Sequence, residues 1–414
     1  MKTLCAKGSL RSPSCLAAGL LLASALASAQ APMVGAGPYG VVRILNTDSA
    51  ILEIQEPRQD LHCTVSPFKP ALGFDLRLHA GYEVSIPLRE LAGSGNLLTI
   101  IFRVTREDQY GEQTYFSQRL RAPAIEEDAK GDAYFQGSFD VGEGKYHVDW
   151  LMRDGAERVC SSYWDVDATL SSKDREVSLV LPPGVVEPTE VENFKEEPPV
   201  ERAQGEPLLN LKVLINFAPQ NSNSVVLQPM DTNALVSILR SISRESRIGK
   251  FSLIAFNLQE QRIVYRQDNA DRIDFPALGE ALQSLNLGTV DLKRLGQRHG
   301  DTAFLTELIR RETISEHRPD AIVFAGPKAM LDANIEPEAL KGLGALDYPV
   351  FYMNYILQPH VTPWRDTIGY AVKFFKGAEF TISRPRDLWF AVNDMVNRIL
   401  KFQNDRRVSV ASGR

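Results

Sequence analysis

The sequence has few cysteines, no metal-type histidine spacing and no long apolar run after its N-terminus. The four cysteines include no Cys-x-x-Cys pair, and the six histidines include no His-x-x-x-His or His-x-His pattern. No later stretch approaches the roughly 20 uninterrupted apolar residues of a membrane-spanning helix. The sequence therefore predicts no zinc motif, no cysteine redox motif and no integral membrane span once the N-terminal segment is removed.

Positive charge is also scarce. Lysine and arginine total 46 against 52 aspartates and glutamates, which gives a net charge of -6. Lys2, Lys7 and Arg11 have no acidic residue beside them, so a chain without this segment carries -9. Sequence-independent nucleic-acid binding needs a basic face that displaces counterions, and we therefore expect no nucleic-acid partner.

Familiar catalytic motifs are missing as well. There is no Gly-x-Ser-x-Gly elbow, and Gly142-Glu143-Gly144-Lys145 continues into Tyr146 rather than the Ser or Thr of a phosphate loop. Carboxylates are plentiful, but the sequence does not say which of them meet in a cleft. The residues support no enzymatic activity, and we expect a non-enzyme without a cofactor.

The N-terminus has the pattern of an export signal. Its three basic residues precede a short apolar run, Leu16–Leu26, and Ala27-Ser28-Ala29 fits a small-x-small cleavage site. We predict a signal peptide over residues 1–29 and a mature protein in the periplasm or the external medium. The alternative is an uncleaved anchor.

Removal of the signal peptide leaves two cysteines, Cys63 and Cys160. A lone pair in an oxidising compartment predicts one disulfide, which would close a loop of roughly a hundred residues. The alternative is two separate buried thiols.

A change in composition divides the remaining chain. Residues 182–207 hold seven glutamates and six prolines with few large apolar side chains, which predicts an extended, solvated linker. Residues 34–181 before it contain short strand-like runs separated by Gly, Pro, Asn and Asp, which favours an all-β sandwich. The runs are Val41–Leu45, Ala50–Ile54, Gly73–Leu78, Glu83–Pro87, Leu97–Val104, Tyr115–Leu120, Ala133–Phe139, Lys145–Met152, Ser161–Val166 and Glu176–Leu181.

One stretch of this half resembles a known family. Val141–Trp150 resembles the turn and late strand of immunoglobulin-like domains, in which a tyrosine after a glycine turn packs at a corner. The resemblance covers about ten residues and implies an immunoglobulin-like sandwich.

Residues 208–403 alternate short β-branched strands with helical segments, which predicts a doubly wound, mainly parallel sheet with helices on both faces. The predicted strands are Lys212–Phe217, Phe251–Asn257, Ala321–Ala325 and Val350–Tyr355. The predicted helices are Thr232–Glu245, Phe275–Leu285, Ala303–Glu316, Pro337–Gly342 and Pro385–Phe402. Residues 404–414 are expected to form a disordered tail. Ligands of such sheets usually lie beyond the carboxyl ends of the strands.

Three stretches of this half resemble the von Willebrand factor type A domain of exported bacterial proteins. Val213–Gln220 corresponds to the strand that ends in Asp-x-Ser-x-Ser, and His299–Leu305 to the stretch that supplies the family's threonine. Gly377–Leu388 corresponds to the final strand and closing helix. The resemblance implies the fold of that family and a site for a divalent ion held by Asp, Ser and Thr oxygens.

The ion ligands of that family are mostly replaced here. Asn216, Ala218 and Gln220 occupy the Asp and Ser positions, and Thr302 alone is retained. Asp301 is one residue out of place, and a slipped alignment would bring Ser222 closer without restoring the Asp. The resemblance therefore implies no metal and a degenerate adhesion site. The candidate binding face comprises Asn216, Ala218, Gln220, Ser222, Asp301, Thr302 and Gly326.

Together these patterns predict an exported, non-enzymatic binding or scaffold protein that contacts a protein partner without a metal ion. Two alternatives remain open. One is an envelope hydrolase or carbohydrate-processing enzyme with an unrecognised acidic site, and the other is a metal-dependent adhesion protein with shifted ligands.

Overall fold

The computed structural model divides the chain into a β-rich unit and an α/β unit. It describes residues 33–37, 40–93, 95–107, 113–189, 193–204, 207–221, 224, 226–285, 299–314, 318–344 and 346–412. The β-rich unit comprises Met1–Ala71, Leu78–Thr169 and Leu181–Thr189, and the α/β unit comprises Leu72–Arg77, Leu170–Val180 and Glu190–Arg414. The predicted signal peptide, residues 1–29, lies outside the described residues.

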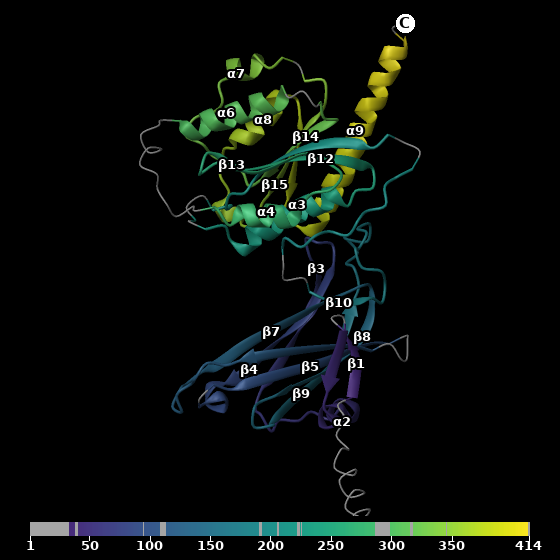
Figure 1. Ribbon diagram of the computed structural model, residues 1–414, viewed down its shortest axis with the longest axis vertical. Coiled ribbons are helices and arrows are strands. Elements are labelled where there is room, and N and C mark those ends of the chain that lie inside the picture. The colour runs from purple at the N-terminus through teal and green to yellow at the C-terminus, as the bar shows by residue number, and fades with distance from the viewer. Residues whose placement is uncertain are drawn as a thin grey trace, which may run out of the picture. The chain divides into compact units, whose positions relative to one another are not determined.

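The β-rich unit contains two four-stranded sheets and a hairpin (Figure 1). The first sheet has the order β10-β7-β4-β3, from β3 (Thr64–Leu72), β4 (Leu78–Pro87), β7 (Asp132–Val141) and β10 (Val186–Pro188). The second has the order β6-β5-β8-β9, from β5 (Leu97–Arg106), β6 (Gln113–Arg121), β8 (Gly144–Arg153) and β9 (Val159–Ala168). The hairpin joins β1 (Met33–Gly37) to β2 (Gly40–Ile44).

Aromatic side chains from both sheets meet in the core of this unit. Tyr82 on β4 lies 5.7 Å from Phe102 on β5 and 5.4 Å from Trp150 on β8, measured between ring centroids. Gly137 on β7 makes room for the Tyr82 ring, since a Cβ there would lie 2.4 Å from the phenol oxygen. The two sheets therefore pack face to face, as the predicted sandwich requires.

The predicted disulfide between Cys63 and Cys160 is confirmed. Their Cα atoms lie 6.1 Å apart, and the two cysteines are 97 positions apart in the sequence. Tyr146 also has the expected corner geometry: its ring is buried at the start of β8, and its hydroxyl donates a 2.8 Å hydrogen bond to the Gly142 carbonyl.

Several short runs that read as strands adopt other structures. Ala50–Ile54 belongs to helix α2 (Asn46–Ile54), which turns the buried side chains of Ile51 and Leu52 toward the second sheet. Gly73–Leu78 is a turn that leads into β4, and Glu176–Leu181 forms no strand. A short apolar run is compatible with a buried strand and with a buried helix. Its side chains alone therefore do not distinguish the two.

The α/β unit is built on a six-stranded sheet in the order β13-β12-β11-β14-β15-β16. Its strands are β11 (Leu209–Asn216), β12 (Ile248–Asn257), β13 (Arg262–Ala270), β14 (Ala321–Gly326), β15 (Val350–Tyr355) and β16 (Ala378–Ile382). All neighbouring pairs are parallel except β12 and β13. This arrangement agrees with the predicted doubly wound, mainly parallel sheet.

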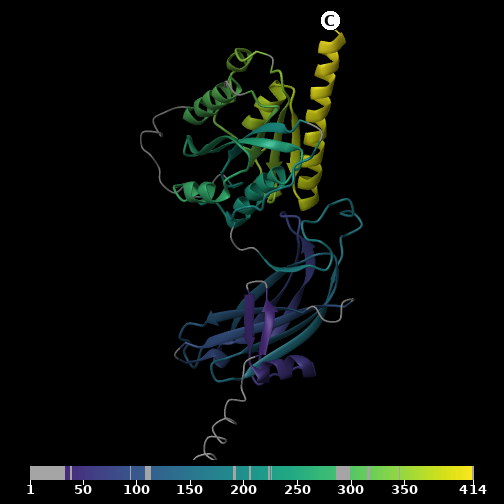
Figure 2. The same ribbon diagram turned by 45° about the vertical axis from the view of Figure 1, so that its right-hand side comes forward.

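Helices cover both faces of this sheet (Figures 1 and 2). One face packs against α3 (Pro229–Ser243), α4 (Phe275–Leu282) and α9 (Pro385–Ser412), the long yellow helix of Figure 2. The other packs against α6 (Gly300–Thr313), α7 (Pro337–Lys341) and α8 (Thr367–Phe374). The antiparallel edge strand β13 and helix α8 are absent from the sequence prediction.

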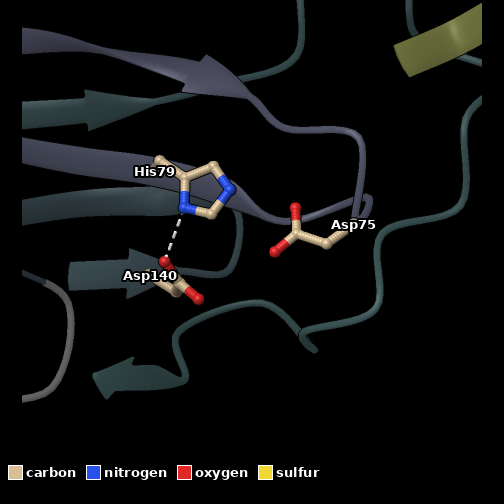
Figure 3. Close-up of side chains that lie close together, drawn as sticks. All are labelled: Asp75, His79 and Asp140. Atoms are coloured by element: carbon tan, nitrogen blue, oxygen red, sulfur yellow. Dashed lines mark hydrogen bonds and ion pairs between the residues drawn. The ribbon is translucent and has the colours of Figure 1, made fainter. Parts of the chain in front are cut away.

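The described parts of the segment 182–207, which its composition predicts to be an extended, solvated linker, make specific contacts. Its β10 strand pairs with β7, and Thr189 donates a 2.7 Å hydrogen bond to the buried carboxylate of Asp140. Asp140 also accepts a hydrogen bond from its cross-strand neighbour His79, at 2.7 Å from Nδ1 (Figure 3). Farther along, Glu197 accepts two hydrogen bonds from the guanidinium of Arg244, the C-cap residue of helix α3. Backbone pairing and ion pairs thus order a segment whose side chains alone do not predict a fold.

The predicted disordered tail is also corrected, because α9 continues to Ser412. Gln403 donates a 2.7 Å hydrogen bond to the Asp320 carboxylate, and Arg406 contacts the Asp347 carbonyl at 3.3 Å. These polar contacts extend the helix beyond its last buried apolar residue, Ile399. Among the described residues, no helix is both long enough and apolar enough to cross a bilayer.

Candidate functional site

A cleft of about 440 Å³ lies at the carboxyl ends of β11, β12 and β14. The chain reverses its direction of travel across the sheet between β11 and β14, and such switch points are where doubly wound sheets usually bind ligands. The residues lining the cleft are Asn216, Ala218, Pro219, Gln220, Leu258, Gln259, Gln261, His299, Gly300, Asp301, Pro327, Lys328, Ala329, Met330, Leu331, Asp332 and Pro363.

Asn216, the last residue of β11, lines the floor of the cleft with only 1% of its surface exposed. Its Oδ1 accepts a 3.2 Å hydrogen bond from the Leu258 amide, which sets the orientation of the side-chain amide. Its Nδ2 has no hydrogen-bond partner among the described residues. Gly326 on β14 has φ +142° and permits this packing, since a Cβ there would lie 3.0 Å from the Asn216 Cβ.

Gln220 joins two loops instead of facing a ligand. Its Nε2 donates to the Gln358 carbonyl at 2.7 Å and to the Thr362 hydroxyl at 2.9 Å. Its Oε1 accepts from the Leu357 amide at 2.9 Å and the Gln358 amide at 3.1 Å. A glutamine side chain has two donor hydrogens and two acceptor lone pairs, so these contacts use its full capacity. Gln220 therefore fixes the loop that carries Pro363 to the cleft.

A buried hydrogen-bond network contacts the backbone of Gln220. Asp231, near the start of α3, accepts hydrogen bonds from the Gln220 amide at 3.2 Å and from the Tyr355 hydroxyl at 3.0 Å. The Tyr355 hydroxyl also lies 3.2 Å from the Ala218 carbonyl. Burial raises the pKa of Tyr355 well above its ordinary value, and the Asp231 carboxylate acts in the same direction. The tyrosine therefore remains protonated and acts as a hydrogen-bond donor.

Asp301 and Thr302 begin helix α6 on one wall of the cleft. The Thr302 amide donates a 2.7 Å hydrogen bond to Asp301, whose charge also favours a helix N-terminus. The Thr302 hydroxyl donates to the Ala333 carbonyl at 3.0 Å, which ties the loop after β14 to this helix. Helix α6 starts at Gly300, and its N-cap residue, His299, has φ 62° and also lines the cleft.

The basic group of the cleft, Lys328, is already in an ionic contact. Its Nζ lies 3.6 Å from Glu379 on β16, and Glu379 accepts a 2.8 Å hydrogen bond from Asn354 on β15. Close by, the Asp366 carboxylate accepts from the Ala329 amide at 3.2 Å and caps helix α8. Burial raises the pKa of Asp366, although the amide hydrogen bonds oppose this shift.

The donor set does not suit a divalent ion. The Asn216 oxygen and the Thr302 hydroxyl are engaged inside the protein, and Ala218 offers no ligand oxygen. In the described part of the α/β unit, no three His, Cys, Asp or Glu side chains bring ligand atoms within 4.8 Å of one another. Mg²⁺ in proteins relies on carboxylate ligands, and the matched positions here supply none.

Four of the seven residues of the predicted binding face line the cleft: Asn216, Ala218, Gln220 and Asp301. Thr302 and Gly326 lie directly behind them, and Ser222 lies outside the described residues. The sequence prediction missed Asp332, Met330 and Pro363. The loop between β14 and α7 has no periodic pattern, so only its place after a predicted strand could have indicated these residues.

Comparisons with known proteins place the chain in no family. No protein-family model and no curated protein matches it. The PilB minor pilin from Streptococcus sanguinis aligns with 73% of this chain and 87% of its own, at 8% identity and a TM-score of 0.27. A β-glucuronidase from Bacteroides uniformis aligns with 76% of this chain and 38% of its own, at 10% identity and a TM-score of 0.19. The putative ApaA protein from Bordetella pertussis aligns with 28% of this chain and 100% of its own, at 7% identity and a TM-score of 0.19. Such low scores assign neither a family nor an activity.

Proposed function

We propose that this chain is an exported, non-enzymatic binding protein that captures a protein partner in the cleft of its α/β unit, without a metal ion. The observation that carries the proposal is a cleft of about 440 Å³ at the switch point of the sheet, with Asn216 at its floor and Gln220 and Thr302 committed to internal hydrogen bonds. In the metal-binding domains that this half resembles, the corresponding positions hold an ion, whereas Gln220 and Thr302 here bond neighbouring loops.

Two further features support this proposal. The Cys63–Cys160 disulfide is typical of proteins that function in oxidising compartments. Beside the cleft, Met330 is 50% exposed and Trp364, which follows the cleft residue Pro363, is 85% exposed. Large exposed apolar side chains beside a cleft are typical of protein-binding surfaces, where tryptophan dominates the binding energy.

A substitution that fills the cleft tests this proposal. Ala329 lines the cleft and is half-buried, so Ala329→Trp should block a bound segment. We expect the immobilised variant to lose the proteins that the wild type captures from an envelope extract, as quantified by mass spectrometry. Ala339→Trp makes the same change at an exposed position of helix α7 and should capture normally.

Metal independence is tested in the same experiment. Capture should be equal in EDTA and in millimolar Mg²⁺ or Mn²⁺, and the thermal midpoint of the free protein should not move. A ligand at 100 times its Kd stabilises the folded state by about 2.7 kcal/mol, which a melt detects readily. A reversible shift with Mg²⁺ would support the metal-dependent alternative, and equal capture by both tryptophan variants would place the interface elsewhere.

A further inference from the structure

Two carboxylates lie on adjoining segments of the cleft wall. Asp301 begins helix α6, and Asp332 lies in the loop that follows β14; both line the cleft. The hydrogen bond from the Thr302 hydroxyl to the Ala333 carbonyl joins these two segments, each next to one of the acids. This contact fixes the two segments that carry the carboxylates relative to each other.

The negative charge of this wall has no basic partner among the described residues. Asp332 is exposed and takes part in no ion pair or hydrogen bond in the described part of the chain. The contacts of the Asp301 side chain are to the amide and hydroxyl of Thr302. Lys328 contributes the positive charge of the cleft, but Glu379 lies 3.6 Å from it and offsets that charge. A cationic group entering the cleft would find complementary charge.

Asn216, at the floor of the cleft, adds a second requirement for a ligand. Asn216 lines the cleft with 1% of its surface exposed, and its Nδ2 makes no hydrogen bond with a described residue. This amide can therefore donate to a ligand that supplies an acceptor. A backbone carbonyl is such an acceptor, and in a peptide it lies next to the side chain of its own residue.

We propose that the cleft binds an extended segment of the partner through a basic side chain, arginine or lysine, which pairs with Asp301 and Asp332 while a neighbouring backbone carbonyl accepts from Asn216 Nδ2. This inference rests on the proposed function and names the chemistry of the partner. The exposed Trp364 and Met330 provide apolar contact for flanking residues.

The test uses random seven-residue peptides displayed on phage and selected on the full-length protein. We expect the selected peptides to share one position occupied by arginine or lysine. Synthetic versions of the peptides are then titrated by fluorescence anisotropy. Replacing the arginine by citrulline, which keeps the shape and removes the charge, should weaken binding at least about tenfold.

Matched variants locate the basic residue in the cleft. Asp332→Asn should weaken binding of the arginine peptide at least about tenfold and leave binding of the citrulline peptide unchanged. Asp405→Asn makes the same change at an exposed position of helix α9 and should have no effect. Asp301→Asn, which retains a capping side chain, should act like Asp332→Asn.

The possible outcomes separate this inference from the proposed function. Peptides that compete with the partner and fail to bind Ala329→Trp, but share an acidic or an uncharged residue, would overturn the basic-residue inference and leave the proposed function standing. If selected peptides bind Ala329→Trp as well as the wild type, or none is selected, both proposals fail. Basic peptides that are insensitive to both aspartate substitutions would also overturn the inference.

Discussion

Gln220 joins two distant parts of the α/β unit through neutral hydrogen bonds. Its amide holds the loop 357–362 against the end of β11 through contacts with residues more than a hundred positions away in the sequence. The contacts need no charged ligand, so they persist when divalent ions are absent. A neutral amide therefore fixes the position of this loop without a charged ligand.

Gln220→Ala should lower the free energy of unfolding by about 2–4 kcal/mol. The substitution removes the partners of two backbone amides and one carbonyl, and buried groups left without partners each cost about 1–3 kcal/mol. Urea denaturation measures the change. Gln283→Ala, at an exposed position after helix α4, serves as the control and should have no clear effect. A loss below about 0.5 kcal/mol in Gln220→Ala would show that water replaces these contacts.

At the residue level, the sequence predicts well which positions lie at the cleft. It predicts the hydrogen bonds and the role of each side chain less well. Asn216, Ala218 and Gln220 lie at or just after the end of a predicted strand, and Asp301 lies just before a predicted helix. Topology brings such positions together. The internal role of Gln220 depends on the loop 357–362, which no local pattern connects to β11. The exposure of Asp332 likewise depends on how an irregular loop lies over helix α6.

Three elements of the α/β unit are joined by a buried ion pair. Lys212 on β11 donates to the Glu312 carbonyl at 3.0 Å and lies 3.3 Å from its carboxylate, and both side chains are buried. Arg266 on β13 donates to the same carboxylate at 2.7 Å. Because Glu312 belongs to helix α6, this network connects the helix that forms the cleft wall to two strands.

Glu312→Ala should destabilise the protein by about 3–5 kcal/mol, because it leaves the buried Lys212 without its carboxylate. Chemical denaturation monitored by circular dichroism measures the change. Glu307→Ala is the control on the same helix: its ion pair with Arg310 is exposed, and we expect no measurable loss. Equal stability of the two variants would mean that Lys212 relaxes toward solvent when its partner is removed.

Elements with a strong local pattern were predicted correctly from the sequence, whereas strand β13 and helix α8 were not. The buried strands β11, β12, β14 and β15 are continuous apolar runs, which is typical of parallel sheets covered on both faces. Strand β13 was missed because it lies at the edge of the sheet and carries polar residues. Helix α8 was missed because several of its residues, Thr367, Ile368, Gly369 and Val372, have low helix propensity.

At the scale of the whole molecule, the disulfide should stabilise the β-rich unit without affecting the α/β unit. Closing a loop of this length removes conformational entropy from the unfolded chain, worth about 4–5 kcal/mol in the simplest model. Hydrogen exchange with and without reductant measures the effect. Reduction should accelerate exchange in β5, β8 and β9 and leave β11, β12 and β14 unchanged.

The double variant Cys63→Ser/Cys160→Ser provides the control for this experiment. Without reductant it should show the same pattern as the reduced wild type, and reductant should cause no further change. Faster exchange throughout both units would mean that they unfold together. Unchanged exchange in β5, β8 and β9 would mean that the disulfide contributes little to native stability.

The division of the chain into units has a consequence for how its gene can be rearranged. The α/β unit draws its residues from three separate stretches, two of them short insertions within the sequence of the β-rich unit. A single crossover between genes can therefore transplant neither unit whole: each exchange would leave part of one unit attached to the other. We therefore expect the two units to be inherited together. A chimera that joins the α/β half to a foreign domain should also need the stretches Leu72–Arg77 and Leu170–Val180.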